Sequence, residues 1–387
     1  MRVSVIGLGR TGLPMAVALA HKGMEVVGID RCERIAQVAK PDWTPREPMC
    51  EWQHRKGVQM CCEMESAADT DLSLLMVGTP EQAAGVMDLS QVETSCRALA
   101  AALGDGPHTL VISSTLYPGT ARDMVRPLLP PTCNVVVNPV WIAQGSVYAD
   151  YTSPPVVLLG CDGPMPCIAE DFADSAFGKG GRVFTDTYTA ELLKLTHNVW
   201  CTTRMSFVNA FAVLFDERGA DVKALTAFFR NGGERSGRFL VPGTPFGGPC
   251  FPRDLRFMAA VCEDDLDIGN LIDFIADTNM DATHRITGDA FMTLRRQRPA
   301  TVGIAGLAYK PGSDVVEESA STAVAISAQR DGAAVLVYDP NVNCNWRGPG
   351  EHAADMADLI ARSDVLVEMH PGLVPSDCPK PVIRPWR

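Results

Sequence analysis

The sequence has no apolar run that approaches the ~20 residues needed to span a membrane. It also lacks the charged start, apolar stretch and cleavage site of a signal peptide, because a strand-like run, Arg2 to Ile6, follows Met1 directly. No short-period repeat or low-complexity tract interrupts the chain. These absences predict a globular protein of the cytoplasm.

Positive charge is in short supply. The chain carries 34 Lys and Arg against 46 Asp and Glu, a net charge of −12. Nucleic acids and anionic membranes bind to basic faces, so both are excluded as expected partners. A small anionic substrate remains compatible with this charge, provided that a few Lys and Arg residues are concentrated at its site.

The 13 cysteines show no metal-type spacing, and we expect no metal site. Cys61 and Cys62 are adjacent, which suits neither a zinc knuckle nor a redox C-x-x-C pair. In the cytoplasm the thiols would stay reduced, and most would be small buried hydrophobic side chains. A reactive cysteine therefore needs a specific local reason.

The 387 residues exceed what one hydrophobic core organises, so two or three domains are expected. Strand and helix patterns alternate through residues 1–185, which predicts a parallel, doubly wound sheet. The expected strands there are Val3–Ile6, Glu25–Ile29, Leu72–Val77, Thr109–Ser113, Asn134–Val137 and Val156–Leu159. Residues 186–296 form an expected helical connector and dimerisation region, and residues 297–387 a second α/β domain.

Within the connector, Tyr188–Arg218 contains no proline or glycine and predicts one long helix, straight or kinked. Helical character returns from Leu255 to about Arg296. In the last region Thr301–Ala305, Ala334–Tyr338 and Ser363–Glu368 are expected strands. The predicted fold is thus α/β, with two Rossmann-like doubly wound domains joined by a long central helix.

A glycine-rich turn, Gly7-Leu8-Gly9-Arg10-Thr11-Gly12, follows the first strand and opens a helix. The glycines let a pyrophosphate approach the backbone, and the helix N-terminus faces it with positive charge. Asp30 ends the next strand, where its carboxylate can bond the adenosine ribose and repel a 2′-phosphate. The pattern predicts NAD binding, although the neighbouring Arg31 weakens the preference over NADP.

Phe246–Asp254 reads FGGPCFPRD and combines two glycines, a cysteine and a proline that suits the first turn of a helix. Cys250 would precede that helix, where the dipole lowers a thiol pKa, and Arg253 would add positive charge. One cysteine among 13 is more often structural, but this loop favours a nucleophile.

Lys194 and Asn198 are four residues apart on the expected long helix and therefore share a face. An ammonium and an amide together could hold an alkoxide or a thiohemiacetal oxyanion. Taken alone, Lys194 would more simply be a solvated lysine. His197 points elsewhere on the helix and is expected to be structural.

These segments, in this order, resemble the UDP-glucose/GDP-mannose dehydrogenase family over nearly the whole chain. The matching segments are GLGRTGLPMA near the start, Val77-Gly78-Thr79-Pro80, Ser114-Thr115 with Pro118-Gly119-Thr120, Asn138-Pro139, Ala190–Lys194 with Asn198, FGGPCFPRD and Gly306–Asp314. The resemblance implies two Rossmann-like domains, a dimer or larger assembly, and oxidation of the C6 alcohol of a nucleotide sugar with two NAD.

The resemblance also implies roles for individual residues. Cys250 would capture the intermediate aldehyde, Lys194 and Asn198 would stabilise oxyanions, and Asp254 would assist proton transfer or water activation. The implied cofactor contacts are the glycine turn with Arg10 and Thr11, and Asp30, Thr79, Thr115 and Arg253. The implied substrate contacts are Phe239, Gly247 and Lys310.

The chain departs from the family pattern at several positions. Val140 and Gln144 stand where two glutamates are usual, Arg253 replaces a lysine, and Glu317 replaces an arginine that meets substrate phosphate. These changes affect the expected hydrolysis step and the expected pose of UDP-glucose. They leave Cys250, Lys194, Asn198 and Asp254 intact.

Four functions are compatible with these residues. The chain could be a four-electron nucleotide-sugar 6-dehydrogenase, or a relative that takes another nucleotide substrate or stops after one two-electron oxidation. A β-hydroxyacid dehydrogenase shares the fold and the lysine–asparagine helix but has no use for Cys250. A catalytically silent binding protein would have no need for the intact catalytic residues.

Overall fold

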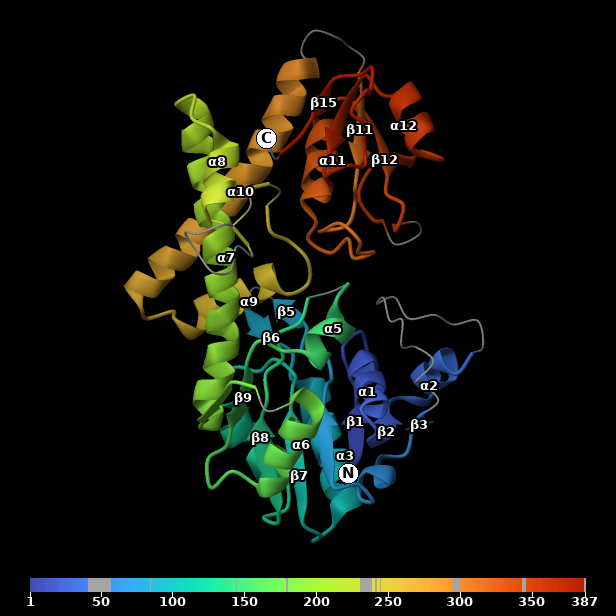
Figure 1. Ribbon diagram of the computed structural model, residues 1–387, viewed down its shortest axis with the longest axis vertical. Helices are drawn as coiled ribbons and strands as arrows, with labels where there is room; N and C mark the ends of the chain where they lie inside the picture. The colour runs from blue at the N-terminus through green and yellow to red at the C-terminus, as the bar shows by residue number, and fades with distance from the viewer. Residues whose placement is uncertain are drawn as a thin grey trace. The chain divides into compact units, whose positions relative to one another are not determined.

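The computed structural model describes residues 1–40, 57–83, 85–143, 145–178, 180–229, 239–240, 242–243, 245–294, 300–342 and 346–385. Two compact units, Met1–Thr196 (unit 1) and His197–Arg387 (unit 2), make up the chain (Figure 1). Among the described residues, no helix has both the length and the apolar character to cross a membrane.

Unit 1 is built on an eight-stranded sheet of order β10-β9-β8-β7-β4-β1-β2-β3. Its strands are β1 (Arg2–Ile6), β2 (Glu25–Ile29), β3 (Val58–Cys61), β4 (Leu72–Leu75), β7 (His108–Ile112), β8 (Cys133–Val137), β9 (Val157–Gly160) and β10 (Arg182–Thr185). From β3 to β8 the strands are parallel, in the order typical of a Rossmann fold. The predicted doubly wound sheet is confirmed, with one antiparallel pairing, between β8 and β9, toward this edge.

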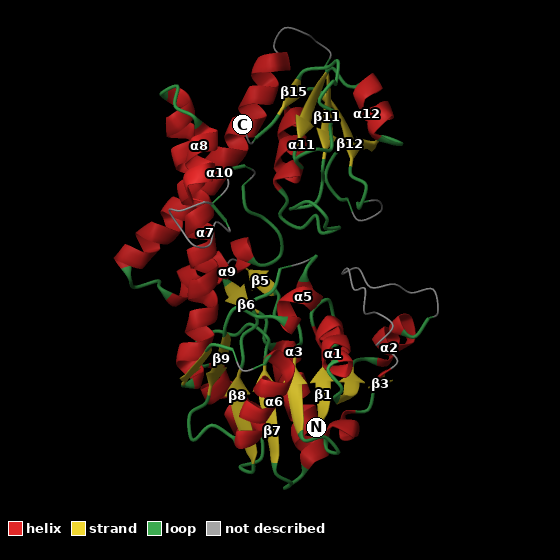
Figure 2. Ribbon diagram, in the orientation of Figure 1, coloured by secondary structure: helices red, strands yellow, loops and turns green. Residues whose placement is uncertain are grey.

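Helices cover both faces of this sheet (Figure 2). They are α1 (Gly12–His21), α2 (Cys32–Val38), α3 (Ser90–Leu103), α4 (Arg126–Leu128), α5 (Val147–Thr152) and α6 (Cys167–Phe177), with a 3₁₀ turn η2 (Met64–Ala67), a π-helical turn η3 (Ala121–Val125) and a hairpin β5 (Glu81–Ala83)–β6 (Val86–Met87). Successive strand residues point to opposite faces: Val3 and Val5 pack with α1, α5 and α6, whereas Ile6 packs with α3. Two apolar cores therefore fix the sheet from both sides.

The predicted long helix is confirmed as α7 (Thr187–Glu217), which begins in unit 1 and continues into unit 2. The helical character expected from Leu255 to about Arg296 is confirmed and is divided between two helices, α9 (Phe251–Val261) and α10 (Leu266–Leu294). Residues 262–265 separate them, and the side chain of Asp265 accepts from the backbone N–H of Ile268 in the first turn of α10. A short helix, α8 (Val222–Phe228), follows α7.

Unit 2 contains a second parallel sheet of order β13-β12-β11-β14-β15. Its strands are β11 (Thr301–Ala305), β12 (Ala334–Tyr338), β13 (Glu351–His352), β14 (Val365–Glu368) and β15 (Val382–Ile383), with helices α11 (Ala320–Arg330) and α12 (Met356–Arg362). At the end of β11, Gly306 has a φ of +96°. There the backbone N–H of Leu307 donates to the Asp339 carboxylate at 2.7 Å.

Candidate active site

The glycine turn of unit 1 joins β1 to α1, as predicted. Gly7 has a φ of +98°, which disfavours any residue with a side chain. A Cβ on Gly12 would lie 1.8 Å from the Gly7 carbonyl oxygen, so the fold of the turn itself requires glycine at both positions. A Cβ on Gly9 would meet no atom within 4 Å. Gly9 therefore leaves open space beside the backbone, which fits the close approach of a pyrophosphate. Thr11 is the N-cap of α1, and its side chain makes no capping hydrogen bond.

Asp30 lies at the end of β2, beside this turn. Its Oδ2 accepts from the Leu8 backbone N–H and its Oδ1 from that of Arg31, both at 2.7 Å. The Arg34 Nε of α2 donates to the Leu8 carbonyl at 2.9 Å. The carboxylate is thus fixed next to the glycine turn, in the position where an adenosine ribose is held in this fold. The residues present fit the adenosine half of a dinucleotide.

Two further segments expected to contact the cofactor come together in unit 1. The Ser114 hydroxyl donates to the Val77 carbonyl at 2.8 Å and links the loop after β4 to the loop after β7. Thr79 is buried, and Thr115 is partly exposed. Both follow the carboxyl ends of parallel strands, where ligands bind in such sheets.

Sequence reasoning did not assign a role to Glu191 of α7. Its carboxylate accepts from the backbone N–H groups of Gly119 and Ala121, at 2.6 and 2.7 Å. Burial raises the pKa of Glu191 to about 7, against the lowering effect of these two donors, and Asp162 and Asp123 raise it further. Glu191 therefore fastens the start of α7 to the Pro-Gly-Thr turn. The sequence feature that could have indicated this role is an acidic residue among the apolar residues of a helix.

Lys194, one turn further along α7, is held against the segment that departs from the family pattern. Its Nζ donates to the Val140 carbonyl at 2.9 Å and lies 5.4 Å from the centre of the Trp141 ring. This partly exposed ammonium is hydrogen-bonded and lies over an aromatic face, and its catalytic role stays a prediction. Gln144 lies outside the described residues.

In unit 2, three of the expected catalytic residues meet at the start of α9. Cys250 is the N-cap of α9, as predicted, and is exposed. Asp254 is fully buried and accepts from the Asn198 amide, with Nδ2 and Oδ2 2.5 Å apart. The Arg253 guanidinium contacts the other oxygen of Asp254 through Nε at 2.8 Å and Nη2 at 2.7 Å.

Arg253 is a positive charge near Cys250, and its own pKa depends on burial and on the acidic groups around it. Burial is the largest single influence on the Arg253 pKa and lowers it, but the nearby Asp254, Cys250 and Glu317 together outweigh that effect and raise the pKa. Arg253 therefore places positive charge close enough to interact with Cys250, which also lies at a helix N-terminus. The arrangement can present a nucleophilic sulfur beside a positioned carboxylate and amide.

The two glycines of the cysteine loop are required by packing inside unit 2. A Cβ on Gly247 would lie 2.2 Å from the Glu318 carbonyl oxygen, and one on Gly248, whose φ is +84°, would lie 2.7 Å from the Tyr309 ring. The Gly248 N–H donates to the Glu317 carbonyl at 3.0 Å. The loop is thereby locked to the segment that carries Lys310.

The three expected substrate contacts all lie in unit 2. Phe239 has a φ of +64° and packs edge-on against Phe251, with ring centres 5.7 Å apart. Lys310 Nζ lies 5.7 Å from the centre of the Tyr309 ring. The Tyr309 ring also meets the position of Gly248, so the structure brings the cysteine loop and the Lys310 segment together.

The sheet order and the glycine turn define a dinucleotide-binding domain. Residues 1–168 match the NAD-binding domain of the UDP-glucose/GDP-mannose dehydrogenase family, and residues 188–281 match its central domain. The chain therefore belongs to this family of NAD-dependent nucleotide-sugar dehydrogenases.

Known relatives agree with this assignment. The chain is 26% identical to a GDP-mannose 6-dehydrogenase of Pseudomonas aeruginosa, over 95% of this chain and 91% of that protein. It is 28% identical to a UDP-glucose 6-dehydrogenase of Rhizobium meliloti, over 95% and 88%. A solved UDP-glucose dehydrogenase from Pyrobaculum islandicum is 25% identical, with a TM-score of 0.87 over 100% of this chain and 94% of that one.

Proposed function

We propose that this enzyme oxidises the primary alcohol of a nucleotide sugar of the UDP-glucose type to the carboxylate, through a covalent intermediate on Cys250. The observation that carries the proposal is the buried Asn198–Asp254–Arg253 cluster at the N-terminus of the helix that Cys250 caps. Bound NAD supplies the hydride acceptor for each oxidation. A β-hydroxyacid dehydrogenase would have no use for this cysteine.

The protein groups divide the chemistry as follows. The Cys250 sulfur adds to the aldehyde carbon and gives a thiohemiacetal, which becomes a thioester on the second oxidation. Lys194 and Asn198 donate to the oxygen that becomes negative. Water then cleaves the thioester, the sulfur leaves as a thiolate, and Asp254 assists the transfer of the proton.

We infer that hydrolysis is the step affected by Val140, which stands where the family resemblance implies a glutamate. Val140 cannot accept a proton, and its carbonyl already accepts from Lys194. We propose that Asp254 alone supports water activation, so thioester cleavage is slow. The alternative is that the substrate is a different nucleotide, or that the product leaves after a single two-electron oxidation.

Rapid mixing with a panel of nucleotide sugars, read by NADH formation and intact mass, tests this proposal. The expected result is a burst of NADH comparable to the enzyme concentration, a slow steady rate, and an adduct on Cys250. Cys250→Ala should abolish acid formation and keep NAD binding, whereas Lys194→Ala should lower turnover by about 100-fold or more. Wild-type acid production by Cys250→Ala would exclude the cysteine.

The mixing experiment also separates the two accounts of Val140. If hydrolysis is slow, Val140→Glu speeds the second phase. If the product leaves after one oxidation, about one NADH forms per substrate, no adduct accumulates, and Val140→Glu has no effect. A linear course with a yield of about two, no burst and no adduct would mean that hydrolysis is not impaired.

We also propose that the enzyme is a homodimer formed along α7. Leu193, Trp200, Phe207 and Leu214 are each more than a third exposed and recur every seven residues, so they form one apolar stripe. A second copy presents the same stripe and can cover it by two-fold symmetry. Light scattering after size exclusion should give a dimer for the wild type and a monomer for Phe207→Glu.

A further inference from the structure

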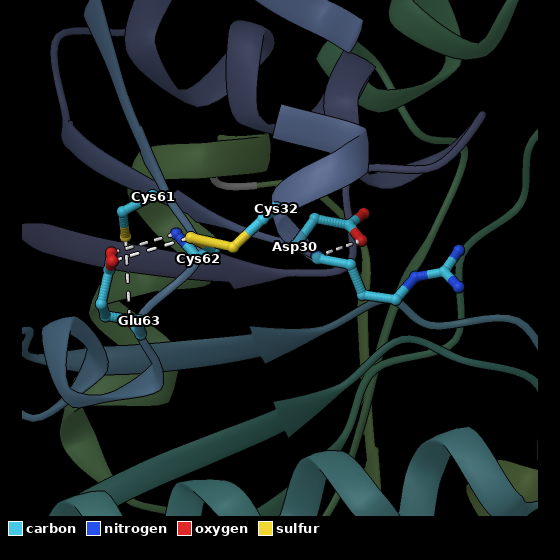
Figure 3. The surroundings of a disulfide bond; sticks show 6 residues. Asp30, Cys32, Cys61, Cys62 and Glu63 are labelled. Atoms are coloured by element: carbon cyan, nitrogen blue, oxygen red, sulfur yellow. Dashed lines mark hydrogen bonds between the residues drawn. A yellow bond between two sulfur atoms is a disulfide. The ribbon is translucent and has the colours of Figure 1, made fainter. Parts of the chain in front are cut away.

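A disulfide joins two cysteines beside the cofactor turn. Cys32, the first residue of α2, is bonded to Cys62, which directly follows β3, with Cα atoms 5.2 Å apart (Figure 3). Both residues are exposed. The expectation that these thiols stay reduced is therefore wrong for this pair, and a reductant in solution can reach the bond.

The disulfide lies next to Asp30, the residue that we expect to bind the cofactor ribose. Cys32 follows Asp30 by two positions, and the Asp30 N–H donates to the Cys61 carbonyl at 3.3 Å, so both ends of the disulfide adjoin Asp30. Asp30 in turn accepts from the Leu8 N–H of the glycine turn. Whatever moves the start of α2 relative to β3 also moves this carboxylate.

A second connection runs from α2 to the same turn. Arg34, two residues after Cys32, donates to the Leu8 carbonyl at 2.9 Å. The N–H and the carbonyl of Leu8 are thus held by the residues that flank Cys32 on either side. The disulfide ties this short segment to the sheet and so fixes both contacts in place.

We propose that the Cys32–Cys62 pair is a thiol–disulfide exchange site, open to thiol reductants, that sets the affinity of unit 1 for NAD. In the bonded state the Asp30 carboxylate is held in place beside the glycine turn, and NAD binds tightly. Reduction frees α2 from β3, and NAD binding weakens. The proposal rests on cofactor binding and is independent of which nucleotide sugar is oxidised.

The exchange balances with a dithiol as the reductant. Its thiolate attacks the Cys62 sulfur, the sulfur–sulfur bond breaks, and Cys32 leaves as a thiolate and takes a proton. The second thiol of the reductant then attacks the mixed disulfide and releases Cys62, so two electrons and two protons are transferred. Glu63 Oε1 lies 3.6 Å from the Cys62 sulfur, where it disfavours a thiolate and can accept from the reduced thiol.

Titration calorimetry with NAD alone tests this proposal on the full chain, purified without reductant. Differential alkylation and mass spectrometry establish the state of each cysteine before and after treatment with dithiothreitol. We expect the NAD dissociation constant to rise about fivefold or more on reduction, and to return on reoxidation with glutathione disulfide. Because no substrate is present, no substrate adduct forms on Cys250, and mass spectrometry shows whether glutathione has reacted with this exposed thiol.

Variants separate this bond from the other thiols. Cys32→Ser and Cys62→Ser should each bind NAD as the reduced wild type does, with and without dithiothreitol. Cys167→Ser removes an exposed free cysteine of the same unit and should respond like the wild type. If a serine variant fails to fold, the comparison of the two wild-type states still decides the question.

Two results would overturn the proposal. One is a dissociation constant that stays within about twofold while mass spectrometry shows full reduction of the pair. The other is alkylation of Cys32 and Cys62 in protein that has never met a reductant, because the bond would then not form. Failure to oxidise any nucleotide sugar would instead contradict the proposed function and leave this one standing.

Discussion

The Asn198 amide donates to the buried Asp254 carboxylate over 2.5 Å, while the Arg253 guanidinium contacts the other oxygen of the same carboxylate. One acid thus links the central helix α7 to the first turn of α9, within unit 2. Such a carboxylate is held in one position, which suits a group that must meet a water or a proton. Replacing Asp254 should therefore lower both the stability of the fold and the turnover rate.

Asp254→Asn should lower the free energy of unfolding by about 3–5 kcal/mol, because it leaves Arg253 without its charge partner in a largely buried position. Urea unfolding measures the change. Arg256→Gln is the matched control: it breaks the exposed Arg256–Glu318 pair and should cost less than about 1 kcal/mol. Equal losses for the two variants would contradict the difference in burial.

Gly248→Ala should be destabilised by about 1–3 kcal/mol, because alanine is strained at a φ of +84° and its Cβ would lie 2.7 Å from the Tyr309 ring. Gly269 of α10 provides the control, since a Cβ there meets nothing within 4 Å. Gly269→Ala should be neutral or stabilise by about 0.5–1 kcal/mol. Denaturant midpoints of the two variants should therefore move in different directions.

Glu191 should make the stability of the enzyme depend on pH. Burial raises its pKa from 4.5 to about 7, so between these values the folded chain binds more protons than the unfolded chain. Stability is then fully present below the lower value and falls, by about 3 kcal/mol at most, as pH rises through the upper one. Urea unfolding near pH 5 and near pH 8 should show this difference. Glu191→Gln should flatten it, and the exposed Glu25→Gln should leave it unchanged.

The free cysteines should differ widely in reactivity. Burial raises the pKa of the Cys96 thiol to about 12 and that of Cys133 to about 11, so neither forms thiolate near neutral pH. Cys167 and Cys250 are exposed. Timed alkylation read by mass spectrometry should modify the exposed pair in the native protein and reach the buried pair only after unfolding. Modification of Cys96 as fast as Cys167 would mean that this core opens readily.

NAD should be preferred over NADP, because the fixed Asp30 carboxylate suits a free ribose hydroxyl and repels a 2′-phosphate. Steady-state assays with the two cofactors measure the ratio of kcat/KM values. Asp30→Ser should narrow that ratio, mainly through a higher KM for NAD. Equal turnover of NADP by the wild type would refute the assignment of Asp30 as the selective group.

The elements that could be predicted from the sequence are those with strong periodicity or a special residue at a fixed place. The strand at Val3–Ile6, the turn at Gly7–Gly12 and the helix starting after Cys250 all have local causes, and the structure contains each of them. The long helix was recognisable because no proline or glycine interrupts it.

The elements that were missed depend on distant partners. β3 is short and pairs with β2 across residues far away in sequence. The Cys32–Cys62 bond joins residues 30 apart, and no spacing rule selects this pair among 13 cysteines. Glu191 acts on Gly119 and Ala121, which only the folded sheet brings near α7.

The turn at the end of β11 has the same backbone geometry as the glycine turn of unit 1: Gly306 and Gly7 have similar positive φ angles, and the next residue donates to an aspartate in both. Asp339 is 3% exposed, its Oδ2 accepts from Leu307 and Ala308, and its Oδ1 accepts from Asn341. Both carboxylate oxygens of Asp339 accept hydrogen bonds from the protein backbone, whereas Asp30 is partly exposed to solvent. The same turn geometry therefore leaves an aspartate available to a ligand in unit 1 and uses one to stabilise the fold in unit 2. A nucleotide that binds unit 2 must be recognised by groups other than Asp339.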